Sequence, residues 1–274
     1  MWTTRYVMRP AVDVVDEIEH NIREYGCNSI EFYDLTAIVK KDWVLEFTAE
    51  LDRRQLGITW QLPSGTRSES IDEEVIRSMA GTGCEFVVYA PESGSPRTLD
   101  MIKKRVNLKN LQNSIRIAKR YGLVVKVNFI VAFPFETRRD ILQTMLFVWK
   151  LALLKVDDCN ISAFAAYPGS EIYQELIEGN ELQRPNDEYF QSLITQFDFT
   201  VQKTVCRHVG AIEVLVYRIL GMSVFYLLSY VRCPVRILRL LKFAGVLFGT
   251  KHWSPRSLFE QRVYDAIARF KTGA

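Results

Sequence analysis

The sequence has few cysteines and histidines, and they do not form groups. Its five cysteines are scattered and include no CxxC or CxxxCxxC spacing; they are Cys27, Cys84, Cys159, Cys206 and Cys233. This pattern argues against a disulfide framework and against a cysteine metal site, and it is typical of reduced thiols in a cytoplasmic protein. The three histidines are also far apart, so the sequence predicts no metal ligand in this chain.

Long apolar runs, repeats and low-complexity segments are also absent. No uninterrupted apolar run reaches the roughly 20 residues that span a bilayer. Arg5 and Arg9 lie near the start, where no apolar core follows them, which argues against a secretory signal. With 274 residues, 48% of them hydrophobic, the chain is long enough to bury one large core.

Charge is divided unevenly along the chain. Residues 203–274 hold 12 Lys and Arg against 3 Asp and Glu, a net charge of +9, so the remainder carries −6 of the total of +3. This C-terminal part is apolar as well as basic, and it lacks the glycine and aromatic interleaving of an RNA-binding arm. The composition therefore favours a membrane surface or an acidic partner over nucleic acid.

Within this part, residues 211–248 combine apolar stretches with regularly spaced cations. Arg232, Arg236, Arg239 and Lys242 recur every three or four residues. The pattern predicts a pair of interfacial helices. Two interpretations stay open: peripheral contact with a membrane, or burial of the apolar faces on the preceding domain or a partner.

Strand and helix signals alternate through the first part of the chain. Strand-like apolar runs occur at 29–33, 58–62, 85–89, 124–131 and 159–164. Amphipathic helical segments separate them, and no hairpin turn signal occurs between them, which predicts a parallel sheet with right-handed crossovers.

The predicted fold class is α/β. We expect an incomplete parallel (β/α) barrel, a partial TIM barrel of about five βα units, followed by an all-helical C-terminal region. The expected division is a barrel at 1–175, a connecting helix and loop at 176–210, and a basic apolar helical tail at 211–274.

Three polar motifs stand where strand-like runs end. They are Pro91-Glu92-Ser93-Gly94-Ser95, Phe133-Pro134-Phe135-Glu136-Thr137 and Tyr167-Pro168-Gly169-Ser170. Because the carboxyl ends of parallel strands meet at one edge of a sheet, we expect the motifs to share one small-molecule pocket.

The order of these motifs resembles the radical S-adenosylmethionine (SAM) core of enzymes that carry an N-terminal cobalamin-binding domain. The likeness covers about residues 5–175 and includes Phe32-Tyr33-Asp34, Trp60 with Arg67, and Gly83-Cys84. It implies a partial (β/α)6 barrel that holds SAM and a [4Fe-4S] cluster at its mouth, with cobalamin in the intact enzyme. The family's CxxxCxxC cluster loop is missing, and we expect that loop, its strand and any cobalamin domain to lie upstream of Met1.

The resemblance implies an enzyme for radical methyl transfer or rearrangement at an unreactive carbon of a small-molecule or lipid-like substrate. This chain alone is expected to be inactive, because no cysteines are arranged to hold the cluster. The alternative is a non-catalytic barrel scaffold that docks on a membrane or on a partner, such as a separate N-terminal domain, through its helical tail. We expect a cytoplasmic location, peripheral at the membrane if the tail binds lipid.

The resemblance also implies a set of cofactor-binding residues, whereas catalytic residues stay unassigned. The set is Asp34, Arg67, Glu92, Ser93, Asn128, Ile130, Ala132, Tyr167 and Gly169. Asp34 would accept hydrogen bonds from the SAM ammonium group, although a helix N-cap explains it equally well. Arg67 would pair with the SAM carboxylate as a bidentate fork, and a surface arginine is the alternative.

For the remaining positions the resemblance gives specific expectations. Glu92 would bind both ribose hydroxyls, whereas Ser93 and Ser95 also suit an N-cap of the next helix. Asn128, Ile130 and Ala132 would let adenine and ribose approach the backbone, and the alternative is a plain buried strand.

Two positions depart from the family. Ala132 and Phe135 stand where it usually has glycine, which should narrow the approach to the backbone. The turn at Tyr167 and Gly169 would meet the adenine edge, although such turns are common. Lys103-Lys104-Arg105 is expected to be a solvated loop.

Overall fold

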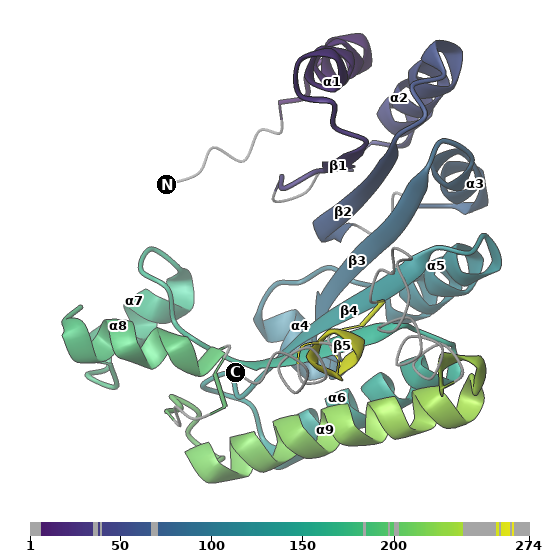
Figure 1. Cartoon of the computed structure of the whole chain (residues 1–274). Coiled ribbons are helices and arrows are strands. Elements are labelled where there is room, and N and C mark those ends of the chain that lie inside the picture. Colours follow the sequence, from purple (N-terminus) through teal and green to yellow (C-terminus); the bar gives the residue numbers. More distant parts are fainter. Residues whose placement is uncertain are drawn as a thin grey trace, which may run out of the picture.

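The computed structural model describes residues 7–34, 38, 40–66, 71–182, 185–196, 198–199, 203–237, 256–257, 259–263 and 265. Its centre is a five-stranded sheet in the order β1-β2-β3-β4-β5, with every neighbouring pair parallel (Figure 1). The strands are β1 (Ser29–Glu31), β2 (Thr59–Thr66), β3 (Cys84–Glu92), β4 (Val124–Val131) and β5 (Asp158–Ala163). Because neighbouring strands are parallel, helical crossovers connect them.

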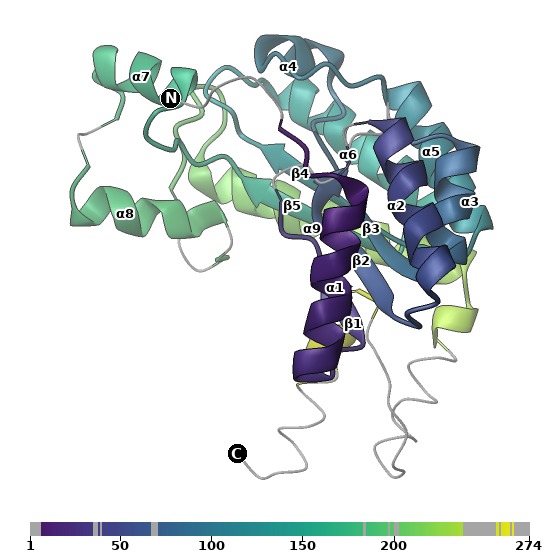
Figure 2. The same ribbon diagram turned by 90° about the horizontal axis from the view of Figure 1, so that it is seen from above.

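Five helices belong to the βα units. They are α1 (Ala11–Tyr25), α2 (Lys41–Arg54), α3 (Glu73–Gly81), α5 (Leu108–Arg120) and α6 (Arg138–Leu153). Figures 1 and 2 show them along one side of the sheet. The short helix α4 (Pro96–Met101) follows the carboxyl end of β3.

Beyond β5 the described chain is helical. Helices α7 (Glu171–Glu178) and α8 (Asp187–Leu193) and the 3-10 helix η2 (Ile194–Gln196) follow the last strand. Helix α9 (Ala211–Arg232) then lies beside α6 and β5 (Figure 1). The expected α/β fold class, a partial parallel barrel followed by a helical region, is confirmed. The exact domain boundaries stay a prediction.

Alternation along β4 shows which face of the sheet forms the core. Val125, Val127, Phe129 and Val131 are fully buried, whereas the residues between them are only partly buried. The Phe129 ring meets Phe147 of α6 edge-on, with centroids 6.1 Å apart. The β-branched run therefore packs under the helices, and the alternate side chains point to the opposite, inner face of the sheet.

Helix α9 closes the free edge of β5 with a buried arginine. Arg218 is 1% exposed; its Nε donates to the carbonyl of Ile161 at 3.0 Å and its Nη2 to the carbonyl of Gln196 at 3.1 Å. An edge strand leaves backbone carbonyls without a ladder partner. A guanidinium can satisfy such acceptors, and they in turn compensate its removal from water.

Further contacts hold this helical region on the barrel. Tyr226 donates its hydroxyl to Asp158 at 2.6 Å, and Arg236 pairs with Asp157 at 2.8 Å. At Gly221 an added Cβ would lie 2.5 Å from the sulfur of Met145 and 2.6 Å from Cδ1 of Ile161. The glycine thus allows the close approach of α9 to α6 and β5.

The expected helix pair at 211–248 is only partly within the described residues. The described part is one 22-residue helix, α9, followed by residues 233–237. By length and composition α9 is the single helix of the described residues that could cross a membrane. Sequence reasoning missed this length because Arg218 interrupts the apolar run, whereas in the fold Arg218 is buried against the barrel.

We predict that Arg218→Met lowers the free energy of unfolding by about 2 to 4 kcal/mol, because the carbonyls of Ile161 and Gln196 would stay buried without a donor. Urea unfolding followed by circular dichroism measures the change. Arg232→Met, at the exposed end of the same helix, is the control and should change stability by about 0.5 kcal/mol or less. Equal losses in the two variants would contradict this role of Arg218.

Candidate functional site

Two unusual backbone turns lie side by side at the carboxyl ends of β3 and β4. Glu92 has a φ of 70° and Ala132 a φ of 69°, and Glu92 pairs in the sheet with Phe129. The left-handed region is unfavourable for residues other than glycine, and such strain concentrates at functional sites. Both residues belong to the cofactor-binding set predicted from the sequence.

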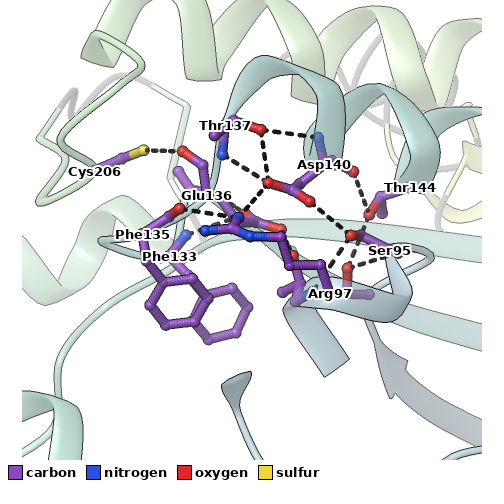
Figure 3. Close-up of polar contacts among 12 residues, drawn as sticks. Ser95, Arg97, Phe133, Phe135, Glu136, Thr137, Asp140, Thr144 and Cys206 are labelled. Carbon is purple, nitrogen blue, oxygen red and sulfur yellow. Dashed lines mark hydrogen bonds and ion pairs between the residues drawn. The ribbon is translucent and has the colours of Figure 1, made fainter. Parts of the chain in front are cut away.

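The buried carboxylate of Glu136 holds the turn after β4. Its Oε2 accepts the backbone N–H of Ala132 at 2.7 Å and that of Phe133 at 3.2 Å. Its Oε1 accepts the hydroxyl of Thr98 at 2.9 Å, which connects the turn to α4. Figure 3 shows this carboxylate at the centre of the network between the two loops. The three bonds fix the left-handed conformation of Ala132.

Burial makes Glu136 easy to protonate. The side chain has no exposed area, and burial raises its pKa to about 7. The hydrogen bonds from Thr98, Phe133 and Ala132 oppose this rise, and the nearby Asp140 carboxylate adds to it. The loop after β4 thus depends on a carboxyl group that titrates near neutral pH.

A second acid, Asp140, joins the loop after β3 to the start of α6. It accepts the hydroxyl of Ser95 at 2.8 Å and pairs with Arg97 at 2.7 Å. It also completes a capping box with Thr137, the N-cap of α6. Burial disfavours ionisation of Asp140, but the bonds from Thr137, Ser95 and Arg97 outweigh it and lower the pKa.

The loop after β3 is also pinned directly on α6. The Ser93 hydroxyl lies 3.0 Å from Oγ1 of Thr144, which also accepts the Gly94 N–H at 3.0 Å. A Cβ at Gly94 would lie 2.6 Å from Cβ of Phe147, so only glycine fits this contact. Ser95 caps α4, as the N-cap alternative predicted. Ser93 is fully buried, and its hydroxyl braces the loop.

An unsatisfied polar atom lies on the inner face of β4. Oδ1 of Asn128 is buried and accepts no hydrogen bond from the described residues. Asn160 stands opposite it on β5 and donates to Ser162 at 3.1 Å. A buried acceptor without a partner costs about 1–3 kcal/mol, so Oδ1 of Asn128 needs a donor from outside the described residues, a water or a ligand. Ile130 follows on the same face.

Glu92 has a partner that sequence reasoning missed. Lys104 lies 3.1 Å from its carboxylate, and both side chains are partly exposed. The Lys103-Lys104-Arg105 segment was expected to be a solvated loop, but its turn after α4 brings Lys104 back to the strand end. This turn depends on the positive φ of 56° at Lys103. Because lysine is not typical of that backbone conformation, the sequence gives no signal for the turn.

The other predicted site residues lie away from the ends of β3 and β4 or outside the described residues. Asp34 is exposed just after β1, and the N-cap of α2 is Lys40, so the N-cap alternative for Asp34 is wrong. Arg67 lies outside the described residues. Tyr167 donates its hydroxyl to Gln196 at 2.5 Å, and Gly169 has a φ of 88° in the turn before α7. Both follow the carboxyl end of β5.

The residues that the structure describes do not fit an iron–sulfur cluster. No group of three His, Cys, Asp or Glu among them could hold a metal ion. Cys84 and Cys159 are buried in strands, where burial raises the thiol pKa and so opposes the thiolate that a cluster needs.

These observations define a class: a partial parallel α/β barrel, a fold whose members place their sites at the carboxyl ends of the strands. Residues 2–148 match the sequence model of the Radical SAM superfamily. The chain belongs to this superfamily, which confirms the resemblance.

Two curated relatives and one solved structure illustrate the likeness. An uncharacterised methyltransferase of Pyrococcus horikoshii is 31% identical over 63% of this chain and 37% of its own length. The cytidylyl-2-hydroxyethylphosphonate methyltransferase of Streptomyces wedmorensis is 32% identical over 48% of this chain and 25% of its own length. The radical SAM methyltransferase TsrM of Kitasatospora setae, solved with cobalamin and a [4Fe-4S] cluster, matches 67% of this chain and 36% of its own, with a TM-score of 0.55 and 18% identity. The chain thus spans less than two fifths of each.

We predict that stability decreases as pH rises through the titration of Glu136. Between the ordinary value of 4.5 and about 7 the folded state binds more protons than the unfolded state, so unfolding becomes easier as pH increases. The shift corresponds to about 3 kcal/mol. Glu136→Gln, which keeps an acceptor for both backbone N–H groups, should flatten this dependence.

Thermal unfolding at a series of pH values between about 5 and 8 measures this slope. Glu178→Gln, at an exposed position of α7, is the matched control and should keep the slope of the wild type. A Glu136→Gln variant with an unchanged slope would contradict the assignment.

Proposed function

We propose that this chain forms the SAM-binding part of a radical SAM methyltransferase. The observation that carries the proposal is the buried Oδ1 of Asn128, which has no hydrogen-bond partner among the described residues and lies on the inner face of the sheet near two left-handed turns. Superfamily membership and the methyltransferase names of the relatives support it. Rearrangement at an unreactive carbon is the other reaction class, whereas the names of the two relatives above favour methyl transfer.

SAM supplies a sulfonium centre whose carbon groups become reactive in this superfamily. In the proposal, Glu92 accepts hydrogen bonds from both ribose hydroxyls, and Lys104 orients the carboxylate from 3.1 Å. Asn128 accepts a hydrogen bond from the adenine amine or a hydroxyl through its free Oδ1. Ile130 and the Ala132 turn provide the apolar and backbone surface against adenine.

The outer members of the predicted set complete this proposal. Asp34 would bind the SAM ammonium group and Arg67 the carboxylate, while the turn at Tyr167 and Gly169 would meet the adenine edge. Ser93 acts through Thr144 by fixing the loop that carries Glu92. It is therefore a positioning residue.

We further propose that the [4Fe-4S] cluster and cobalamin are held by another part of the protein or by a partner. The sequence has no CxxxCxxC motif, and the described residues contain no metal-ligand group. The same observation favours a second candidate, a non-catalytic scaffold that keeps the barrel. A small-molecule or lipid-like substrate and a cytoplasmic location stay predictions.

We predict that Glu92→Ala weakens SAM binding by about tenfold or more, because a hydrogen bond to a charged group contributes about 1.5–3 kcal/mol. Asn128→Ala should weaken it about three- to tenfold, in line with a neutral hydrogen bond. Isothermal titration calorimetry with SAM measures both. Glu85→Ala, at the exposed start of the same strand as Glu92, is the control and should bind like the wild type. No binding by the wild-type chain would favour the scaffold.

We predict that this chain, reconstituted with iron and sulfide under reductant, does not release 5′-deoxyadenosine from SAM. The reason is that its scattered cysteines provide no three-thiolate site. Liquid chromatography with mass spectrometry detects the product, and an intact radical SAM enzyme treated in parallel is the positive control. Sustained turnover by this chain would show that it holds a cluster after all.

A further inference from the structure

Helix α9 buries polar side chains and exposes apolar ones, the reverse of a usual surface helix. Its buried residues follow one face at helical spacing, and they include polar side chains; they are Val214, Arg218, Gly221, Phe225 and Ser229. Arg218 bonds the carbonyls of β5 and η2, and Ser229 is bonded to Arg236. One of its three charged side chains, that of Arg218, is therefore directed into the protein.

The outer face of the same helix is mostly aliphatic, and it also exposes Ser223 and Arg232. Six large apolar side chains are about half exposed or more; they are Ile212, Val216, Ile219, Leu220, Leu227 and Val231. Together they form what we name the α9 stripe. Ile212 and Val231 are 74% and 72% exposed, and the stripe runs for roughly 28 Å at 1.5 Å per residue. The neighbouring α6 exposes Leu142 and Leu146 as well.

Such a surface needs a partner that is itself apolar. Soluble monomers rarely expose contiguous apolar patches larger than a few hundred Å². In α9 the apolar side chains of the stripe face water, whereas Arg218 is buried in the protein. The stripe therefore indicates a contact with another phase or another molecule.

Helix α9 is nevertheless not free to cross a bilayer. Although its length and composition would allow a span, Arg218 and Tyr226 hold it along β5, and Arg236 binds just beyond its end. Crossing would expose this buried arginine and the polar edge of the sheet to lipid, which is costly. The geometry instead suits a helix that lies in the plane of a membrane surface.

The charges around the stripe favour an anionic lipid surface over a protein. The only acid in α9, Glu213, is paired with Arg138 at 2.7 Å. Arg232 is exposed at the end of the helix, and Arg262 is exposed on the segment that packs beside it.

An apolar cavity opens next to the stripe. It has a volume of about 710 Å³, and Ile219, Leu227, Phe259 and Arg262 are among its lining residues. Phe259 packs on Tyr226 with ring centroids 5.3 Å apart, which ties this segment to α9. Apolar walls beside an exposed guanidinium fit the acyl chain and the phosphate of a lipid.

We propose that the α9 stripe docks this chain on the surface of an anionic bilayer, with α9 parallel to the membrane plane. Aliphatic side chains enter the acyl boundary, and Arg232 and Arg262 meet lipid phosphates. The net charge of +9 in residues 203–274 adds long-range attraction to such a surface. The docking does not depend on SAM binding, so either proposal can fail alone.

Flotation of the 274-residue chain with vesicles tests the proposal. We expect the chain to float with vesicles of equal parts phosphatidylcholine and phosphatidylglycerol, and to float less at high salt, where the attraction is screened. Val216→Asp combined with Leu227→Asp should lower the binding by about tenfold or more, because each apolar side chain contributes about 1.5–3 kcal/mol when removed from water.

The matched control is Val12→Asp combined with Tyr25→Asp, which adds the same charge at exposed apolar positions of α1 and should keep the binding. Absence of flotation by the wild type overturns the proposal. A wild-type dimer in light scattering that the α9 variant alone dissociates would show that a second copy covers the stripe. A lower melting temperature of the α9 variant relative to the control would show that the chain itself covers it.

Discussion

The mouth of the barrel depends on one buried carboxylate, that of Glu136. Its two bonds to the backbone of Ala132 and Phe133 hold a left-handed turn that a glycine would adopt freely and an alanine does not. Sequence reasoning took the alanine at 132 as a departure that narrows the pocket. In the fold the backbone at Ala132 adopts the left-handed turn that glycine would favour. The alanine therefore differs from glycine here only by its methyl group. The stability of this turn thus depends on the protonation state of an acid with a pKa of about 7.

Helix α6 connects the candidate site with the rest of the molecule. Its first turns carry Thr137 and Asp140, which fix both loops, and Thr144, which holds Ser93 and Gly94. The same helix packs against α9 along its length, and Arg138 at its start pairs with Glu213. The loops that carry Glu92 and Ala132 therefore have one rigid support, which also holds the helix that exposes the apolar stripe.

The sequence allowed the strands and the positions at their ends to be predicted, because these follow from local periodicity. The apolar run at 124–131 predicted β4, and the polar motif after the run at 85–89 located Glu92, whereas the family resemblance singled out Asn128, Ile130 and Ala132. Contacts between distant residues could not be predicted in this way. Glu136 and Thr98 are 38 residues apart, and the pairing of Glu92 with Lys104 depends on a turn without a sequence signal.

The burial of Arg218 follows from the way the sheet ends. A further strand next to β5 would donate hydrogen bonds to the backbone carbonyls of β5. Arg218 donates such a bond to the carbonyl of Ile161 instead. The sheet thus ends at β5, and Asn128 on its inner face is partly exposed although its Oδ1 is buried. A chain of polar contacts connects that face with α9: Tyr226 donates to Asp158, which lies 3.4 Å from Lys126. Because Lys126 and Asn128 share one face of β4, these contacts connect α9 with the strand that carries the buried Asn128 carbonyl.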